Sequence, residues 1–353
     1  MRTSKLVNWA LEGLALVALA ACTGNAVRSP SASFSLPFVR SAGQAEPAHQ
    51  PRFLHEYQLP LGTYPSSIVA GSDGAMWFGD YPAFTYHQPI NLGVGRITLT
   101  GKQHYYVFGR GVYDVAEGGD GKVWFTEAYG YGPHHRIGSI ATNGTRKEYR
   151  VQSQGEPESI AADASQHLWY TAFGGNPDII EITTNGKTVG RFKAAAGFAD
   201  KVAYGASGRI WFNAIANPVV VGLITHHGGQ RYGPIGGPNY VPGPMALGPD
   251  GRMWICDGNM LAAVDGSLTV SRYALPSGGN FADVAAGPDG NLWATDFINS
   301  AIVRVTITGV MTEYKTPPPS LVPSAITVGP DHNIWFTEMQ PKTDVVKIGV
   351  LKP

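Results

Sequence analysis

One tryptophan recurs at a nearly constant interval along this chain, and this repeat constrains the fold more than any other feature. Seven of the eight tryptophans are separated by 39 to 47 residues; they are Trp77, Trp124, Trp169, Trp211, Trp254, Trp293 and Trp335. The phrase before each reads, in its fullest form, Gly-Pro-Asp-Gly-Asn-Leu-Trp at residues 287–293. Asp-Gly between apolar runs predicts a hairpin with positive φ at both turn positions. The third and fourth copies are degraded, with Ser165-Gln166 and Ser207-Gly208 in place of Asp-Gly.

Each repeat contains four short strand patterns: one before the turn, the tryptophan strand, an Ile-Gly-Arg-Ile type strand and a Glu-Tyr strand. Four strands in about 40–45 residues is the period of a propeller blade. The last unit ends after its third strand at residues 348–350, and residues 54–60 supply an extra Glu-Tyr strand at the other end. We therefore predict an all-β, seven-bladed β-propeller over residues 52–353, closed by the N-terminal strand that completes the last blade. An open solenoid would need polar end caps that the sequence does not show.

Composition agrees with this fold and excludes several partners. The chain has 45 Gly and 26 Pro, about one fifth of its 353 residues, and only 15% charged residues. Lys and Arg balance Asp and Glu at 26 each, which excludes the basic footprint of a nucleic-acid binder. We expect a monomer. Two cysteines are too few for a disulfide framework, and Cys256 falls within a strand where we expect a core residue.

The N-terminus has the pattern of an export signal. Residues 1–21 combine a basic start with a short apolar run, and Leu19-Ala20-Ala21-Cys22 resembles the lipobox of bacterial lipoproteins. This resemblance implies that Cys22 is lipidated and that residues 22–51, rich in Ser, Ala and Pro, form a flexible tether. The protein would then be anchored in the bacterial cell envelope, at the outer membrane if the cell has two membranes. The alternatives are a plain signal peptide with an incidental cysteine, or a short membrane anchor.

The repeat units resemble the virginiamycin B lyase family. They read Gly-Pro-Asp-Gly-x-x-Trp-Phe-Thr-Glu, Ile-Gly-Arg-Ile-Thr and Thr-Glu-Tyr, and the likeness extends from about residue 52 to residue 353. It implies an elimination that opens the ester of a cyclic depsipeptide, with a His base in a Glu-Pro-His phrase on the final blade. It also implies a second His on the preceding blade and Mg²⁺ held by Glu. The matching positions here are Val322-Pro323-Ser324 and Ala282, so neither His is present.

Polar residues gather at one end of the strands, which we name the upper face. It is defined by the positions three residues after and eleven residues before each tryptophan, near the expected channel mouth. The candidate ligand-binding residues there are Tyr113, Glu127, Glu156, Glu158 and Asp200. Glu158 and Glu338 are the candidates for catalysis and for holding Mg²⁺ or Ca²⁺, because hard cations take carboxylate oxygens.

The alternative for these acids is a structural role, in which they accept hydrogen bonds from backbone amides. Five of the seven positions three residues after the tryptophan are acidic, and a repeated bond to backbone amides would explain such repetition. We favour this interpretation for Asp80, Asp257 and Asp296.

Two long loops carry aromatic residues toward the same face. They contribute Tyr86, Tyr131 and His134 as further candidate ligand-binding residues, because long loops in compact domains are often functional. The alternative is a pair of loops packed by their own side chains.

Three functions follow from these patterns. The first is an envelope-anchored, ligand-binding or divergent member of the family, which lacks the catalytic His and binds a small molecule, peptide or glycan. The second is a divalent-metal-dependent lyase that opens a cyclic ester of the streptogramin B type. The third is a gluconolactonase-like hydrolase. The absence of His at Ser324 and Ala282 favours the first, and whether the protein is an enzyme stays open at this stage.

Overall fold

The computed structural model describes residues 50–81, 92–130, 136–150, 155–174, 178–194, 197–216, 218–225, 228–235, 243–340, 343 and 345–353. The chain divides into two units, residues 1–50 and 51–353, and all strands belong to the second. The predicted signal peptide and Cys22 lie outside the described residues, as do Tyr86, Tyr131 and His134 of the two loops.

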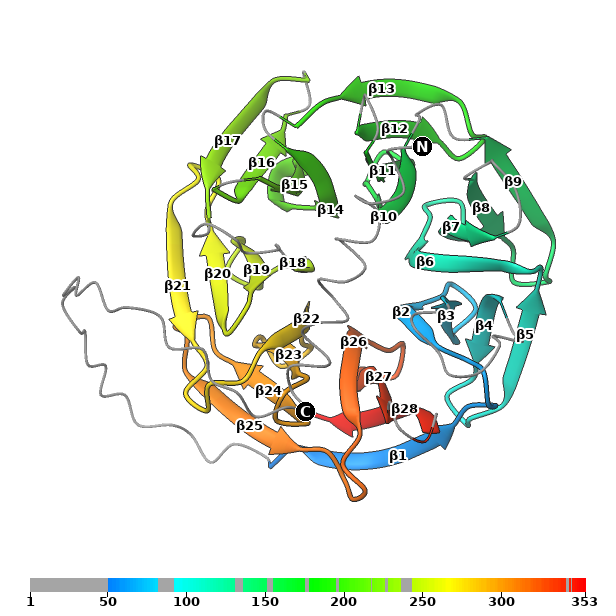
Figure 1. The fold of residues 1–353 in the computed structure, drawn as a ribbon, viewed down its shortest axis with the longest axis vertical. Helices are drawn as coiled ribbons and strands as arrows, with labels where there is room; N and C mark the ends of the chain where they lie inside the picture. Colours follow the sequence, from blue (N-terminus) through cyan, green and yellow to red (C-terminus); the bar gives the residue numbers. More distant parts are fainter. Residues whose placement is uncertain are drawn as a thin grey trace, which may run out of the picture. The chain divides into compact units, whose positions relative to one another are not determined.

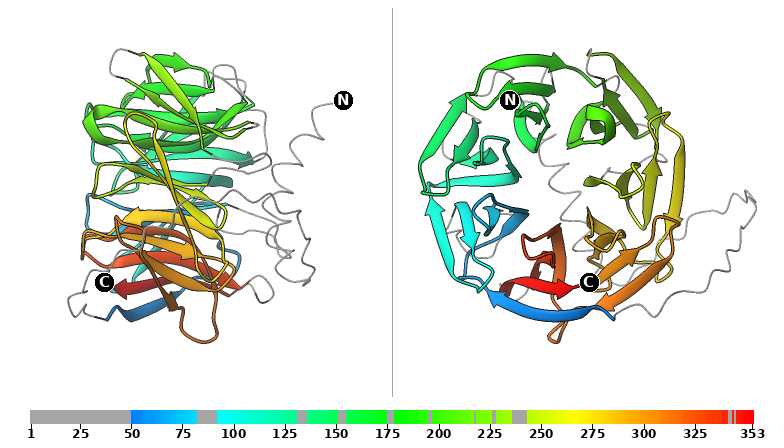
Figure 2. Two further views of the ribbon diagram at one scale, coloured as in Figure 1. Left: turned by 90° about the vertical axis from the view of Figure 1, so that its left-hand side faces the viewer. Right: turned by 180° about the vertical axis from the view of Figure 1, so that it is seen from behind.

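In the described residues, the strands form seven antiparallel sheets of four strands, and these blades follow one another around a ring (Figure 1). Within each blade the first strand lies nearest the axis of the ring. Figure 2 shows the same ring from the side and from behind. This confirms the predicted seven-bladed propeller.

The strands of blades 1 to 4 run from the axis outward. Blade 1 contains β2 (Pro65–Ala70), β3 (Met76–Asp80), β4 (Gly93–Ile97) and β5 (Gln103–Val107). Blade 2 contains β6 (Arg110–Glu117), β7 (Val123–Gly130), β8 (Arg136–Ile140) and β9 (Arg146–Arg150). Blade 3 contains β10 (Glu156–Ala162), β11 (His167–Phe173), β12 (Ile179–Thr183) and β13 (Thr188–Phe192). Blade 4 contains β14 (Phe198–Tyr204), β15 (Ile210–Ile215), β16 (Val220–Ile224) and β17 (Gln230–Pro234).

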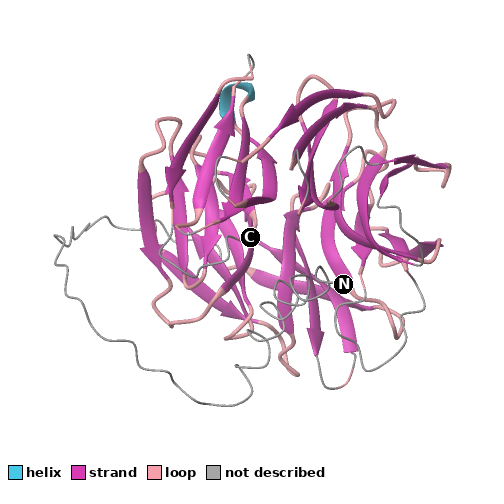
Figure 3. Cartoon of the chain, turned by 45° about the horizontal axis from the view of Figure 1, so that its top comes forward, coloured by secondary structure: helices cyan, strands magenta, loops and turns pink. Residues whose placement is uncertain are grey.

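The remaining three blades follow the same order. Blade 5 contains β18 (Met245–Leu247), β19 (Met253–Asp257), β20 (Met260–Val264) and β21 (Val270–Ala274). Blade 6 contains β22 (Phe281–Ala286), β23 (Leu292–Asp296), β24 (Ala301–Val305) and β25 (Met311–Lys315). Blade 7 contains β26 (Val322–Val328), β27 (Ile334–Gln340), β28 (Val345–Lys352) and, from the start of the propeller, β1 (Arg52–Gln58). The one helix of the described chain is a short 3₁₀ turn, η1 (Ala206–Gly208), coloured cyan in Figure 3.

The ring closes through blade 7. Strand β1 pairs antiparallel with β28, with Arg52 opposite Lys352 and Gln58 opposite Lys347. In Figure 1 the blue β1 and the red β28 lie side by side. The predicted closure is therefore confirmed: β1 takes the outermost position of blade 7 and gives it four strands, as in the other blades.

The hydrophobic core lies between blades. The buried side chains form seven clusters, and each repeat tryptophan belongs to the cluster between its own blade and the next. Trp77 of blade 1, for example, packs with Val112, Val115 and Phe125 of blade 2. An aromatic residue of the outer strand, such as Tyr106 beside Trp77, stacks on the indole within the same blade. Each blade therefore buries its tryptophan only when its neighbour is present.

The turn before each tryptophan differs from the predicted geometry. In the repeat at residues 287–293, Gly290 has a φ of 74°, whereas the preceding Asp289 is not among the residues with positive φ. The Gly290 N–H donates to the Gly287 carbonyl, which is the pattern of a type I turn followed by a left-handed residue. The expectation of positive φ at both positions was wrong for Asp289, whose side chain binds the tryptophan of the next strand. Its Oδ1 accepts the Trp293 indole N–H at 3.0 Å.

The glycine that opens the phrase is required by the same packing. A Cβ added at Gly287 would lie 2.3 Å from Cδ1 of Trp293 and 2.6 Å from Oδ1 of Asp289. The indole therefore lies directly over the glycine backbone.

Among the described residues, no helix is long and apolar enough to cross a membrane.

We predict that Gly287→Ala lowers the free energy of unfolding by about 1–3 kcal/mol, because the methyl group must displace a buried indole. Denaturant unfolding followed by tryptophan fluorescence measures the change. Gly233→Ala is the matched control, since its Cβ would meet nothing closer than the Leu268 Cβ at 3.4 Å. We expect the control to stay within about 0.5 kcal/mol of the native chain. Equal effects in the two variants would contradict this account of the turn.

Candidate functional site

A bulge in the innermost strand of most blades presents two residues at the upper face. In blade 3 the β10–β11 register shifts between Pro157 and Ile160, which leaves Glu158 and Ser159 outside the regular pairing. The Thr171 hydroxyl holds this bulge, because it accepts the Ser159 N–H at 3.1 Å and donates to the Asp200 carbonyl of blade 4 at 2.6 Å. Thr126 and Thr295 make the same pair of bonds in their blades.

The sequence places the residue eleven before the tryptophan beside one two or three after it, and in blade 3 Glu158 lies in the bulge opposite Thr171, two after the tryptophan. The residue paired with the one three after the tryptophan is twelve before it, as in Pro157 opposite Ala172. The bulge releases the residues eleven and ten before the tryptophan from the ladder.

Three of the predicted residues come together around Lys201, a charged residue of the same face. Lys201 lies in the β14 bulge of blade 4, and its Nζ is 3.3 Å from the Tyr113 hydroxyl of blade 2 and 3.4 Å from Oδ1 of Asp200. The same ammonium lies 4.7 Å from the centre of the Tyr113 ring. Its charge also acts on Glu158 of blade 3 and on Asp114 of blade 2. We name Tyr113, Glu158, Asp200 and Lys201 the Lys201 cluster.

The protonation states inside the Lys201 cluster follow from burial and charge. Burial raises the pKa of Glu158 well above its ordinary value, and the neighbouring Asp200 raises it further. Burial alone would lower the pKa of Lys201, but Asp200, Tyr113 and Glu158 together raise it well above its ordinary value. These shifts favour a protonated Glu158 and a charged Lys201. Both are hydrogen-bond donors.

Two further carboxyl groups near the axis were missed by the sequence analysis. Asp114 and Asp283 each stand ten residues before a tryptophan, and each accepts backbone N–H groups from its own blade and the next. Burial raises the pKa of Asp283 to about 7. The charge of Asp114 also raises this pKa, whereas that of Lys201 lowers it. The available signal was a charged residue at this position in three repeats, namely Asp114, Lys201 and Asp283.

The acids three residues after the tryptophans are buried rather than exposed at a channel mouth. Asp80 accepts the Tyr64 N–H at 2.9 Å and Asp296 accepts the Asn280 N–H at 3.0 Å. The structural interpretation is confirmed for these two. Asp257 instead lies 3.4 Å from the guanidinium of Arg272.

Glu127 and Glu338, at the same position in blades 2 and 7, are different. Both oxygens of each side chain are buried without a hydrogen-bond donor. Glu127 has its pKa raised to about 7, chiefly by burial, and Arg110 lies 3.5 Å from it.

Glu338 belongs to a buried acid pair on the outer side of blade 7. Its neighbour Glu56 on β1 binds Nζ of Lys347 at 2.9 Å through one oxygen, and its other oxygen has no donor. A proton on Glu338 supplies that donor. Burial and the contact with Glu56 together raise the pKa of Glu338 to about 8.

The remaining predicted positions do not add a base. Glu156 begins β10, and its charge contributes to the raised pKa of Glu158. Ala282 and Ser324 lie in the innermost strands of blades 6 and 7, and the Ser324 carbonyl accepts the Thr295 hydroxyl bond. Cys256 is buried in β19, as predicted.

The Mg²⁺ that the resemblance implies does not fit the described residues of the upper face. A hard dication needs several oxygen ligands. In the Lys201 cluster the ammonium of Lys201 already lies among the carboxyl groups and would repel a second cation. Glu158 and Glu338 belong to blades 3 and 7 and have different neighbours, so they do not form one site.

The fold is a seven-bladed β-propeller of four-stranded antiparallel blades. The sequence profile of the Virginiamycin B lyase family matches residues 48–193, 90–279 and 182–350. The chain therefore belongs to the virginiamycin B lyase family. No curated protein matches it.

Solved structures give the same result for the fold. A streptogramin B lyase structure is similar with a TM-score of 0.73 at 22% identity, covering 86% of this chain and 97% of that one. A catalytically inactive virginiamycin B lyase from Staphylococcus aureus, solved with quinupristin, has a TM-score of 0.73 at 25% identity, covering 86% and 100%. The WD40 repeats of RRP9 have a TM-score of 0.64 at 11% identity, covering 86% and 97%.

We predict that the protein becomes less stable as pH rises from about 5 to about 9. The pKa of Glu338 is raised in the folded state, so its contribution is fully present below the ordinary carboxyl range and is lost as pH rises through about 8. Glu338→Gln does not ionise and should reduce the loss, by on the order of 2 kcal/mol. Denaturant unfolding at several pH values measures both slopes.

The matched control is Glu313→Gln, on the outer strand of blade 6, where the carboxylate pairs with Lys315 at 3.8 Å. It should keep the native slope. A Glu338→Gln profile as steep as the native one would contradict the assignment.

Proposed function

We propose that this chain is a ligand-binding, divergent member of the virginiamycin B lyase family, anchored in the bacterial cell envelope through Cys22. It binds a small molecule, peptide or glycan at the upper face and does not carry out the His-based elimination. The observation that carries the proposal is the distribution of polar groups. They gather on blades 2 to 4 around Lys201, whereas blades 6 and 7 present Ala282 and Ser324.

The elimination needs a base that takes the proton next to the ester carbonyl. An alanine has no basic atom, and a serine hydroxyl accepts a proton only when a neighbouring base activates it. The carboxyl groups of the Lys201 cluster are poor substitutes, because burial raises the pKa of Glu158 and favours its protonated form, and Asp200 faces the Lys201 ammonium.

The same cluster is suited to binding. Glu158, Lys201 and the Tyr113 hydroxyl offer donors from three neighbouring blades. A ligand with several carbonyl or hydroxyl acceptors, such as a cyclic peptide, would match them. Quinupristin is present with the S. aureus relative, so it is a suitable probe.

The envelope location is supported by the sequence alone. Residues 19–22 read Leu-Ala-Ala-Cys, and the propeller begins about thirty residues later, at β1. A tether of that length would keep the ring clear of a membrane surface.

We predict that quinupristin binds to the purified chain and is recovered with its ring closed. Calorimetry measures binding, and liquid chromatography with mass detection measures conversion. An elimination would give a product of unchanged mass and new retention time, whereas ester hydrolysis would add one water. Tyr113→Phe and Glu158→Leu, which remove a hydroxyl and a carboxyl donor, should each weaken binding about tenfold, the effect of one lost hydrogen bond.

Thr312→Val, on the outer strand of blade 6, is the control and should bind as the native chain does. Ring opening that disappears in Glu158→Gln would contradict the proposal and would identify the cluster as catalytic. A product heavier by one water would favour the hydrolase instead.

A further inference from the structure

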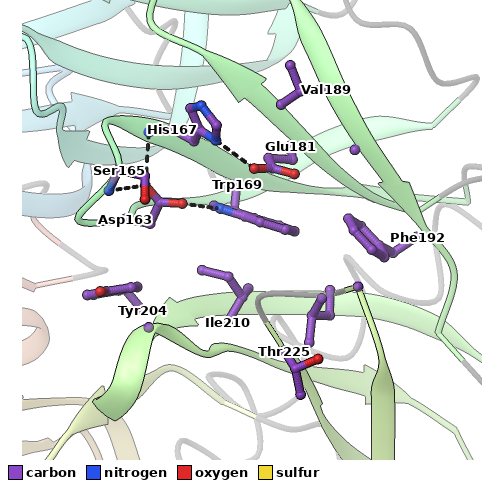
Figure 4. Close-up of a pocket in the computed structure, with 14 residues that line it drawn as sticks. Asp163, Ser165, His167, Trp169, Glu181, Val189, Phe192, Tyr204, Ile210 and Thr225 are labelled. Carbon is purple, nitrogen blue, oxygen red and sulfur yellow. Dashed lines mark hydrogen bonds and ion pairs between the residues drawn. The ribbon is translucent and has the colours of Figure 1, made fainter.

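A pocket of about 330 Å³ lies between blades 3 and 4 at the turn end of the strands, away from the upper face. Its walls combine the aromatic rings of Trp169, Phe192 and Tyr204 with three polar side chains of blade 3 (Figure 4). Those polar residues are Asp163, His167 and Glu181. The pocket is formed by the two blades whose turn phrases the sequence shows as degraded.

The degraded turn explains why a pocket opens there. Five repeats place a glycine six residues before the tryptophan and an aspartate four before it, whereas blade 3 places Asp163 at the glycine position and Ser165 at the aspartate position. The glycines in this position have no room for a Cβ against the indole, as at Gly118, where it would lie 2.5 Å from Trp124. Trp169 must therefore lie differently from the others.

Trp169 differs from the tryptophan of the preceding blade in the exposed fraction of its side chain. Trp169 is 6% exposed, whereas Trp124 of the preceding blade is fully buried. In blade 4 the turn is the 3₁₀ segment η1, which contains Gly208 of the pocket wall.

The three polar residues are also a departure from the sister blades. In blades 1 and 6 the residue opposite the tryptophan is an arginine, and it pairs with the turn aspartate, as Arg304 does with Asp289 at 2.8 Å. In blade 3 that position is Glu181, and His167 lies 2.6 Å from it through Nδ1. The ion pair between arginine and aspartate is thus replaced in blade 3 by two carboxyl groups and an imidazole.

Donor atoms of these three residues all lie within 4.8 Å of one another, and this is the one such group of His, Cys, Asp or Glu in the described residues. Zinc bonds to nitrogen and oxygen are about 2.0–2.2 Å long, so two ligands of one ion lie roughly 3.3 Å apart. Small side-chain rotations would bring the three donors to that spacing.

Asp163 is already oriented as a metal ligand would be. Its Oδ1 accepts the N–H groups of Ser165 and His167, and its Oδ2 accepts the Trp169 indole N–H at 2.9 Å. Carboxylates that bind metals are commonly fixed by such outer bonds. A carboxylate has about four acceptor sites, so one of them is still available for an ion.

We propose that Asp163, His167 and Glu181 form a binding site for a transition-metal ion such as Zn²⁺. One imidazole and two carboxylates are a donor set that zinc accepts, and three protein ligands leave its fourth position open. That position faces the pocket, whose aromatic walls would surround a small ligand of the metal. This site is independent of the Lys201 cluster.

The test is a Zn²⁺ titration of the full chain after dialysis against a chelator, followed by calorimetry. We expect one ion per chain to bind at micromolar concentrations or below through this site. His167→Asn and Glu181→Gln should each weaken that binding at least tenfold. Asn is the residue at the same turn position in blades 6 and 7, Asn291 and Asn333, so the first variant should fold. Thermal unfolding without metal confirms that it does.

His332→Asn is the matched control, because His332 lies on the corresponding turn of blade 7 outside any such group of donors. It should bind Zn²⁺ as the native chain does. With Cu²⁺ in place of Zn²⁺, electron paramagnetic resonance should show coupling to one imidazole nitrogen that His167→Asn removes. The proposal is overturned if the native chain binds no Zn²⁺, or if its binding survives both the His167 and the Glu181 substitutions.

Discussion

The indole N–H of each repeat tryptophan is a single polar atom inside an apolar layer, and its partner determines much of the blade. In five blades the aspartate four residues before the tryptophan accepts that N–H, as Asp120 does for Trp124 at 3.0 Å, and in blade 3 Asp163 does so. The bond fixes the turn, the turn sets the register of the two inner strands, and the indole fills the space against the next blade. Because every indole needs the following blade for burial, the ring must close, and β1 completes it.

This dependence explains how much the sequence could predict. The tryptophan spacing, the four strand patterns and the divided last blade predicted the architecture, since each is repeated several times. The bulges could not be predicted from one repeat, because the side chain that holds a bulge can join two blades, as the Thr171 hydroxyl does. The central position of Lys201 in its cluster could not be predicted for a related reason. Its importance comes from side chains on blades 2 and 3, far away in sequence.

Departures from the repeat are where the chemistry lies. The Lys201 cluster occupies bulges that hold small or apolar residues in other blades, such as Gly243 and Ala282. The proposed zinc ligands Asp163, His167 and Glu181 lie in blade 3. There the indole N–H is bound by Asp163, six residues before the tryptophan, and not by an aspartate four residues before it. Both groups are on blade 3 or its neighbours, and neither uses a position at which the resemblance expects a catalytic His.

The Lys201 ammonium lies among the carboxyl groups of Glu158 and Asp200, and its charge would exclude a divalent cation from them. A calorimetric titration with Mg²⁺ tests this exclusion most directly, with the native chain compared with Lys201→Met and with the double variant Lys201→Met, Glu158→Gln. The account predicts no Mg²⁺ binding at the cluster of the native chain, and binding by Lys201→Met that the added Glu158→Gln removes. Mg²⁺ binding by the native chain that Glu158→Gln alone abolishes would contradict it.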